Sequence, residues 1–282
     1  MSFRLFLILG LALFSVSTTS IVVRHLVLVP AVVIAFWRMF TASVMLWSYS
    51  AVKPSGKLSP ENRIPIILAG IFLGSHFATF FVAVRLTSIA SATLLGCLAP
   101  LFTSILEWLS GEELKEKVIT GLCLSLFGAL ILQLNPSSVG NASAGNFLAI
   151  ASSFFMALTW FQAKKIRKNT NTVVYGRTLF FISSITIFLV VLFTKESIFG
   201  FGSESFFWFL FLGFVPSVLG HNLLNYSIKH ISATSVSSVV LGEPIIASIL
   251  GYIIFGEEIP QSSWVGGSLI LVGLYYLLNN KD

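Results

Sequence analysis

The sequence predicts an all-α membrane protein with ten transmembrane helices in two inverted-topology five-helix repeats. The composition is the first reason: 56% of the 282 residues are hydrophobic and only 10% are charged, whereas soluble domains carry about 25% charged residues. The second reason is that apolar residues fall in windows of about 20 residues, the length that crosses a bilayer core. The third reason is a match between the two halves of the chain.

Ten apolar windows, bounded by charges, Pro or Asn, give the expected helices. They cover residues 3–23, 30–50, 64–84, 87–110, 116–134, 145–163, 173–194, 205–228, 231–255 and 263–279. The first window is longer than the apolar core of a secretory signal, and Thr18-Thr19-Ser20 makes a poor cleavage site. We therefore expect this first segment to be retained as a membrane helix.

The positions of Lys and Arg predict the orientation, because cytoplasmic loops are enriched in these residues. With the N-terminus in the cytoplasm, thirteen of the 17 Lys and Arg residues face the cytoplasm, three face outward, and Arg38 lies within the second window. The basic island at residues 164–168 fits an ordinary anchor, with specific binding of anionic lipid as the alternative. We expect a multi-pass protein of the cell inner (cytoplasmic) membrane with both termini in the cytoplasm.

Two stretches of the chain carry nearly the same motif. They read LGCLAPLFTSILEWLSGEE, residues 95–113, and LGEPIIASILGYIIFGEE, residues 241–258. Pro100 and Pro244 are 144 positions apart, and the glycines on the following window keep a spacing of 145. These pairs are Gly121 with Gly266 and Gly128 with Gly273.

The match predicts how the two halves sit in the membrane. We expect a first repeat over residues 1–139 and a second over residues 140–282. Because each repeat has five spans, an odd number, the second half enters the membrane from the opposite side. Inverted repeats of this kind are the architecture of alternating access, with a substrate site near the midplane. The pattern therefore favours a secondary transporter.

Other function classes leave no signature in the sequence. The net charge is +6, but Lys and Arg sit in short islands between apolar windows, so we expect no nucleic acid partner. Cys97 and Cys123 form no metal-binding or redox spacing, and the four histidines form no zinc-binding pair. The sequence also lacks the phosphate-binding, dinucleotide and serine-nucleophile motifs. We expect no enzyme activity, no catalytic residues, no metal and no cofactor.

The repeated motif has the same order of residues in both halves: small polar residues, Pro, aliphatic residues, Gly-Glu, and two glycines on the next span. Further motifs are Trp37-Arg38, His76-Phe77, Gly176-Arg177, Gly220-His221-Asn222 with Asn225, and Glu243-Pro244. Over nearly the whole chain this pattern resembles the EamA family of the drug/metabolite transporter (DMT) superfamily. The resemblance implies a basket of ten helices around a central cavity, lined by spans one to four and six to nine. It also implies export or exchange of small metabolites, often amino-acid-like and commonly driven by protons.

Glu243 is the first candidate for transport chemistry. It lies near the middle of the window at residues 231–255, where inserting a charged side chain costs about 2.5–3.5 kcal/mol. We expect it to bind a proton or the substrate. The alternative is a structural role, in which a protonated carboxyl bonds the backbone carbonyl freed by Pro244. Because the first repeat has Ala99 at the matching position, the role of Glu243 differs between the halves.

Two histidines lie at nearly matching depths of the two repeats. His221 belongs to SVLGHNLLNYSIK, in which Ser217, His221 and Asn225 recur every four residues and would share one face of an α-helix. His76 is its approximate counterpart in the first repeat. We expect both histidines to bind substrate or protons, with Asn222 and Asn225 in support. The alternative is that each histidine only bonds a neighbouring helix.

Two arginines and two prolines complete the candidates. Arg38 lies about two turns inside the second window, where it can hold a substrate carboxylate or pair with Glu243. Its counterpart Arg177 lies nearer the cytoplasmic edge, and we expect its side chain to extend to the interface. Pro100 and Pro244 are candidate hinges for the fourth and ninth spans, with static kinks as the alternative.

The sequence therefore predicts a secondary transporter that moves a small metabolite across the inner membrane by alternating access, with or without proton coupling. Its expected partners are a small-molecule substrate and the lipid bilayer, and a homodimer is left open. An integral-membrane enzyme with a histidine general base and a structural membrane protein are the alternatives. Neither alternative explains why the halves should be inverted.

Overall fold

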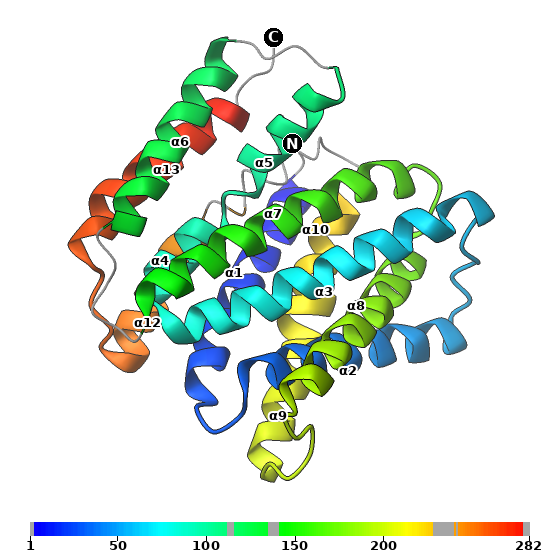
Figure 1. Cartoon of the computed structure of the whole chain (residues 1–282). Coiled ribbons are helices and arrows are strands. Elements are labelled where there is room, and N and C mark those ends of the chain that lie inside the picture. The colour runs from blue at the N-terminus through cyan, green and yellow to red at the C-terminus, as the bar shows by residue number, and fades with distance from the viewer. Residues whose placement is uncertain (1–2, 112–115, 135–140, 228–239, 241, 279–282) are drawn as a thin grey trace.

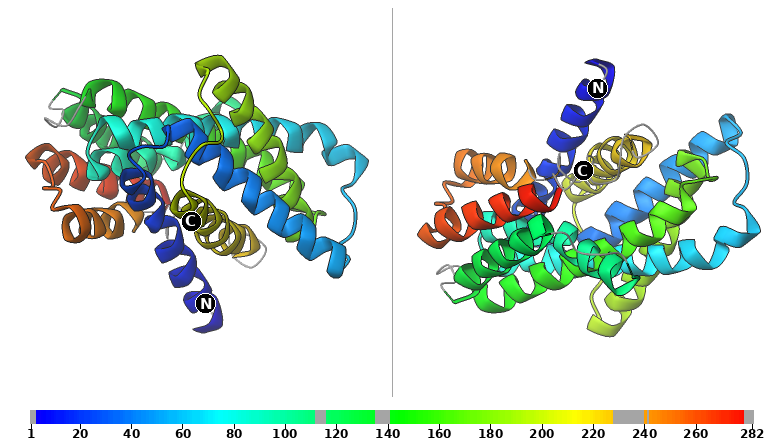
Figure 2. Two further views of the ribbon diagram at one scale, coloured as in Figure 1. Left: turned by 90° about the horizontal axis from the view of Figure 1, so that it is seen from below. Right: turned by 90° about the horizontal axis from the view of Figure 1, so that it is seen from above.

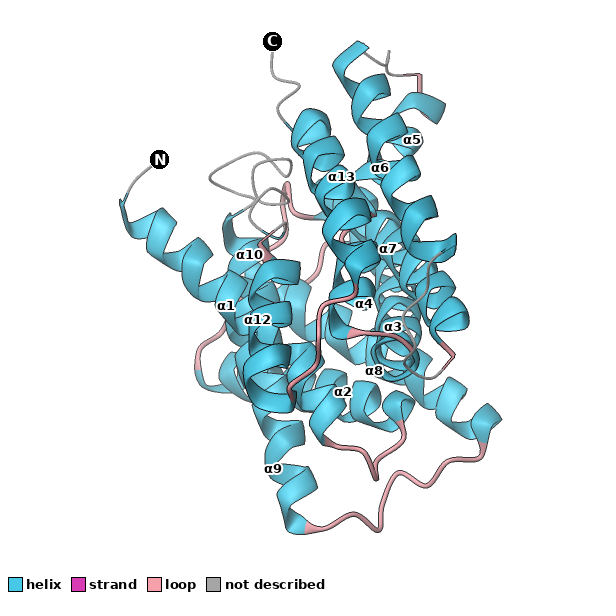
Figure 3. Cartoon of the chain, turned by 90° about the vertical axis from the view of Figure 1, so that its left-hand side faces the viewer, coloured by secondary structure: helices cyan, strands magenta, loops and turns pink. Residues whose placement is uncertain are grey.

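A computed structural model of the chain describes residues 3–111, 116–134, 141–227, 240 and 242–278. Within these residues every regular element is a helix and no strand occurs (Figures 1 and 3), so the predicted all-α class is confirmed. The elements of the first half are α1 (Phe3–His25), α2 (Ala31–Val52), the 3₁₀ turn η1 (Pro60–Asn62), α3 (Arg63–Leu86), α4 (Ile89–Gly96), α5 (Ala99–Leu109) and α6 (Glu116–Leu134). Those of the second half are α7 (Ala142–Ile166), α8 (Thr172–Thr194), α9 (Ser203–Leu212), the π-helix η2 (Gly213–His221), α10 (Asn222–Ser227), α12 (Glu243–Phe255) and α13 (Gln261–Leu278).

Seven helical segments in the described part of the chain are long and apolar enough to cross a membrane, so the chain is a multi-pass membrane protein. They are Leu5–His25, Ala31–Val52, Pro60–Leu86, Ile89–Leu106, Ala142–Ile166, Thr172–Thr194 and Ser203–Ser227. Shorter apolar helices occur at Ile119–Leu132 and Glu243–Phe255. Each of these segments overlaps a predicted window. The start of the predicted window 231–255 and the predicted repeat boundary at residues 139 and 140 lie outside the described residues.

The fourth predicted window forms two helices instead of one. α4 ends at Gly96, and α5 begins at Ala99. Pro100 lies in the first turn of α5, where its missing N–H costs no helical hydrogen bond. Pro244 has the same place in α12, directly after Glu243. Glu243 and Pro244 thus stand at the start of α12 and not inside it. Their predicted place near the middle of the window 231–255 stays a prediction, because residues 231–239 and 241 lie outside the described residues.

The predicted eighth window is also not a regular α-helix. Between α9 and α10 the chain forms the π-helix η2, which contains Pro216. Pro216 has no N–H to donate to an earlier carbonyl, and Ser217 Oγ donates to the main-chain oxygen of Leu212, five residues back, at 3.0 Å. A π-helix is rare and occurs frequently at functional sites. Its wider turn removes the predicted alignment of Ser217, His221 and Asn225 on one α-helical face.

The largest apolar core lies mainly between α2, α3, α7, α8 and α9. α6 and α13 pack against each other at one edge of the molecule (Figures 1 and 3). Their contact is so close that a Cβ atom added to Gly266 would lie 2.7 Å from the carbonyl oxygen of Gly128, and one on Gly273 would lie 2.7 Å from that of Gly121. In contrast to this close contact, the first turns of α1 project from the other helices in both views of Figure 2.

Candidate functional site

A cavity lies among the helices that surround the largest core. Its lining residues come from α1, α2, α3, α4, α5, α7, η2, α10 and α12, and it holds about 670 Å³ of atom-free space, its mouth included. The polar lining residues are Thr19, Arg38, His76, Thr93, Cys97, His221 and Glu243. The rest of the wall is mostly apolar and includes the aromatic rings of Phe77, Phe80 and Trp160. A largely apolar cavity with a few converging polar groups is the usual form of a small-molecule site.

The structure brings four of the predicted binding residues into this one cavity. Arg38 comes from α2, His76 from α3, His221 from the end of η2 and Glu243 from the start of α12. The predicted hinge residue Pro100 lines the cavity as well. Residues more than 200 positions apart in the chain therefore face the same space.

Asn222, Asn225 and Pro244 are not among the residues that line the cavity. Asn222 Oδ1 lies against α8, 3.0 Å from the position that a Cβ on Gly176 would occupy. This oxygen is buried and has no hydrogen-bond partner among the described residues. The main-chain oxygen of Asn225 accepts a hydrogen bond from Nη2 of Arg167 at 3.3 Å. A binding role for the two asparagines stays a prediction, as does the hinge role of Pro244.

Arg38 is the most deeply buried charged residue of the cavity, with 1% of its surface exposed. Its Nε donates to Ser217 Oγ at 2.9 Å, and its Nη1 donates to Thr19 Oγ1 at 3.2 Å. The guanidinium carbon lies 4.2 Å from the ring centroid of Phe77, within range of a cation–π interaction. These contacts fix the plane of the guanidinium but bring no negative charge to it.

The two histidines have different surroundings. His76 Nδ1 lies 2.9 Å from the main-chain oxygen of Ser152. Because a carbonyl can only accept, Nδ1 carries the proton, and Nε2 of the neutral ring is an acceptor. The ring of His76 stacks on Phe80, with centroids 5.8 Å apart, and His221 meets Phe77 edge-on at 5.5 Å. Phe77 therefore contacts both Arg38 and His221.

Glu243 begins α12, where a negative charge is favoured by the unpaired N–H groups of the helix start. It shares the cavity with Arg38, but the two side chains form no ion pair within 4.0 Å. Ala99, the matching residue of the first motif, lines the same cavity. The two motifs thus meet at this space, and among the described residues that line it the second motif supplies the carboxyl group.

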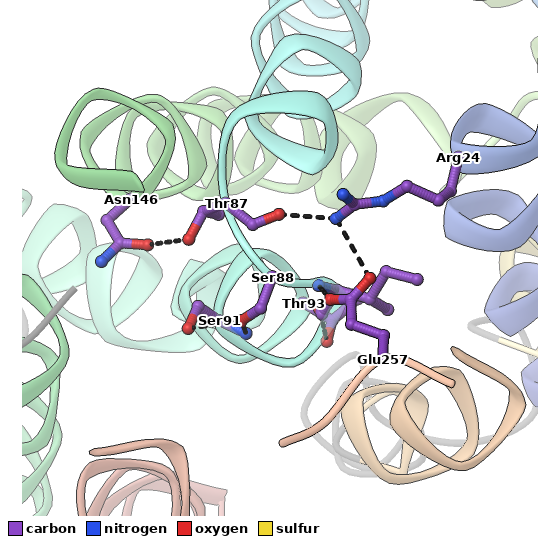
Figure 4. Close-up of polar contacts among 8 residues, drawn as sticks. Arg24, Thr87, Ser88, Ser91, Thr93, Asn146 and Glu257 are labelled. Atoms are coloured by element: carbon purple, nitrogen blue, oxygen red, sulfur yellow. Dashed lines mark hydrogen bonds and ion pairs between the residues drawn. The ribbon is translucent and has the colours of Figure 1, made fainter. Parts of the chain in front are cut away.

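A polar network joins three chain segments at the start of α4 (Figure 4). Arg24 Nη2 donates to the main-chain oxygen of Thr87 at 2.6 Å and lies 3.4 Å from Glu257 Oε2. Glu257 Oε1 accepts a hydrogen bond from the main-chain N–H of Ile89 at 2.6 Å. The network links the end of α1 and the loop after α12 to α4, whose Thr93 and Gly96 line the cavity.

Hydroxyl and amide groups extend this network on both sides. Ser88 caps α4 by accepting from the N–H of Ser91 at 3.1 Å, and the Ser91 hydroxyl lies 3.3 Å from that of Ser263. Thr87 Oγ1 donates to Asn146 Oδ1 at 2.9 Å (Figure 4). The start of α4 is therefore fixed to α1, α7 and α13.

A second buried arginine lies at the end of α7. Arg167 is 3% exposed, and its Nη2 donates to Thr172 Oγ1 at 2.6 Å and to the main-chain oxygen of Asn225. It connects the loop between α7 and α8 to α10. In the matching of the two halves, Arg167 stands 143 positions after Arg24.

Two residues that form polar contacts at or near the cavity were not predicted from the sequence. Thr19 bonds Arg38, and Arg24 forms the ion pair with Glu257. A polar triplet at residues 18–20 inside an apolar window and a lone cation at the end of that window were the available signals. Among the described residues, no three His, Cys, Asp or Glu side chains lie close enough together to hold a metal ion.

Comparisons with known proteins agree with this architecture. A profile of the EamA-like transporter family matches residues 3–134 and 143–279. An uncharacterized transporter of Archaeoglobus fulgidus is 29% identical over 201 residues, which cover 70% of each chain. The pseudopaline exporter CntI of Pseudomonas aeruginosa is 22% identical over 265 residues, 93% of this chain and 91% of its own. The family and these relatives are named as transporters and not as enzymes.

A solved crystal structure has the same fold. It superposes with a TM-score of 0.68 and covers 97% of this chain and 96% of its own, at 17% sequence identity. At that identity the likeness concerns the fold and not the bound molecule.

Proposed function

Because the chain belongs to the EamA-like transporter family, we propose that it is a secondary transporter that moves a small metabolite across the cytoplasmic membrane by alternating access. The observation that carries this proposal is the cavity, which gathers Arg38, His76, His221 and Glu243 inside an otherwise apolar set of helices. Ionisable groups within membrane helices are costly to insert and mark substrate or ion pathways. The cavity is therefore the proposed substrate site.

Two inverted repeats of five helices, ten spans in all, are the proposed scaffold. In this scheme α1 corresponds to α7, α2 to α8, α3 to the α9–η2–α10 segment, α4 and α5 to the region of α12, and α6 to α13. The packing supports it: α1 contacts η2 as α7 contacts α3, and α1 contacts α12 as α7 contacts α5. α2 packs on its counterpart α8, and α6 on its counterpart α13. A pseudo-twofold relation between the halves accounts for all of these pairings.

The proposed orientation has both termini in the cytoplasm. In that orientation the Arg24–Glu257 network lies at the extracellular end of the helices and the Arg167 contacts lie at the cytoplasmic end. Alternating access requires the two ends to open in turn. Because the Arg24–Glu257 network ties α1 and the loop after α12 to α4, it must break before the cavity opens to its side.

Proton coupling is proposed to act through Glu243, with His76 and His221 as further proton- or substrate-binding groups. The similarity to the pseudopaline exporter supports export of a small metabolite, and the resemblance to the family favours an amino-acid-like one. The comparisons and the described contacts give no support to a homodimer, which is not part of the proposal.

Counterflow in proteoliposomes tests the proposal. A metabolite panel is first screened for ligands that raise the Tm of the purified protein, because a ligand that binds only the folded state stabilises it. Proteoliposomes preloaded with such a ligand should transiently accumulate its radiolabelled form above the external concentration, while protein-free liposomes should not. If none of the stabilising ligands accumulates, the result would contradict a carrier and favour an enzyme or a structural protein.

A further inference from the structure

Arg38 carries a buried charge, and no carboxylate among the described residues forms an ion pair with it. Its side chain is 1% exposed, and its two hydrogen-bond acceptors, Ser217 and Thr19, are neutral hydroxyls. Glu243 lines the same cavity but makes no ion pair with Arg38. A buried charge is normally paired, because desolvation without a partner is expensive.

Three N–H donors of Arg38 remain, one on Nη1 and two on Nη2. A guanidinium has five N–H groups in a planar fork, and the contacts of Nε and Nη1 account for two of them. Nη2 is buried and has no hydrogen-bond partner among the described residues. Ser217, Thr19 and the ring of Phe77 hold the plane of the fork, so Nη2 is oriented in advance for an acceptor.

The wall near this donor defines the rest of a ligand. Phe77 and Phe80 lie on α3, and Trp160 lies on α7. These rings offer an apolar, aromatic surface to a molecule whose polar end is at Arg38. A planar guanidinium recognises a carboxylate through paired hydrogen bonds, whereas a cation would be repelled.

We propose that the cavity binds a small organic acid with an apolar or aromatic body, and that Arg38 holds its carboxylate through Nη2. This inference rests on the proposed role of the cavity as a substrate site and adds the chemical class of the ligand. The carboxylate of Glu243 is the other anion able to reach Arg38, and substrate and Glu243 would then compete for one cation.

Three probes with one ring and different head groups test the inference: benzoate, benzamide and benzylamine. At neutral pH they are anionic, neutral and cationic. The Tm of the purified wild-type protein should rise with benzoate and less with the other two. Arg38→Gln should weaken benzoate binding at least about tenfold, since it leaves the carboxylate without its charged partner. Arg177→Gln is the matched control, because Arg177 contacts Trp47 and the main-chain oxygen of Gly56 and does not line the cavity.

Three outcomes would overturn the inference: equal stabilisation by benzamide or benzylamine, unchanged benzoate affinity in Arg38→Gln, or no response of the wild type to benzoate. If Arg38→Gln does not fold, the comparison of the three probes on the wild type decides alone. A larger rise in Tm with benzylamine would indicate a cationic ligand that binds at Glu243. It would leave the carrier proposal intact. The carrier proposal fails separately, through absence of counterflow.

Discussion

At the residue scale, neighbouring groups hold Arg38 and His76 in place, whereas Glu243 makes no ion pair among the described residues. Arg38 is fixed by two hydroxyls and an aromatic ring, and His76 is fixed by the carbonyl of Ser152. Glu243 stands at the free start of α12 and makes no ion pair with Arg38. The acid is thus available to change its protonation or its partner, which is the property that proton coupling needs.

Replacing Glu243 by Gln tests that role. Gln keeps the size and the hydrogen-bonding capacity of the side chain but cannot release a proton at neutral pH. Glu243→Gln should retain exchange of substrate in proteoliposomes and lose the dependence of transport on the pH gradient. Glu204→Gln serves as the control, because Glu204 is 75% exposed and pairs with His25 away from the cavity. A pH dependence like that of the wild type in Glu243→Gln would remove Glu243 from the coupling mechanism.

The sequence predicted residues of the cavity best where a position in one half of the chain could be compared with the matching position in the other half. Arg38, His76, His221 and Glu243 were predicted from matching depth or from charge inside an apolar window, and they line one cavity. Asn225 was predicted from a spacing of four residues along a regular α-helix, and Asn222 from the Gly220-His221-Asn222 motif. The π-helix around Pro216 changes that register, and the local sequence contains no reliable signal for such a turn. Thr19 was missed because a threonine in a membrane helix is ordinary until its partner Arg38 is placed.

At the element scale, helix ends and breaks do most of the positioning. α4 and α5 part at Cys97 and Leu98, so the fourth predicted span presents a short helix end to the cavity. The network of Arg24 and Glu257 holds the other end of α4 in place (Figure 4). Pro100 was predicted as a hinge or a kink within one span, whereas the fold shows two separate helices there.

The Arg24–Glu257 pair should control access to the cavity. Hydrogen bonds to charged groups contribute about 1.5–3 kcal/mol, so loss of the pair should raise the exposure of the cavity by about one order of magnitude. Cys97, which lines the cavity, reports this exposure once Cys123 is replaced by Ser. Its labelling by a water-soluble maleimide should be faster in Arg24→Gln and in Glu257→Gln than in the parent.

A charge swap provides the control for this pair. The double variant Arg24→Glu with Glu257→Arg restores the ion pair but not the bonds to Thr87 and Ile89, so it should return part of the way to slow labelling. Unchanged labelling of Cys97 in both single variants would show that the pair does not hold the cavity closed.

The contact of α6 with α13 depends on glycine. A Cβ atom on Gly128 would collide with the carbonyl oxygen of Gly266, so Gly128→Ala should destabilise the protein by about 1–3 kcal/mol and lower its Tm. Gly10→Ala is the control, because no atom lies within 4 Å of the added Cβ and alanine favours a helix. Equal Tm values for the two variants would mean that α6 and α13 do not pack in this way.

At the scale of the whole molecule, the proposed relation between the two halves pairs the contact of α1 with α12 and the contact of α5 with α7. The inverted repeats themselves stay a prediction. Within the described residues, seven helical segments are long and apolar enough to cross a membrane. Ile119–Leu132 and Glu243–Phe255 are shorter apolar helices within two further predicted windows, and the total of ten spans stays a prediction.

Alternating access is the central claim, and distances at the two ends of the helices test it most directly. Spin labels at Val27 and Ile254 report the contact of α1 with α12, and labels at Lys168 and Leu109 report the related contact of α7 with α5; all four residues are exposed. In nanodiscs, a transported ligand or a change of pH should lengthen one of the two distances and shorten the other. Two distances that stay fixed, or that change together in the same direction while transport is demonstrable, would contradict the account.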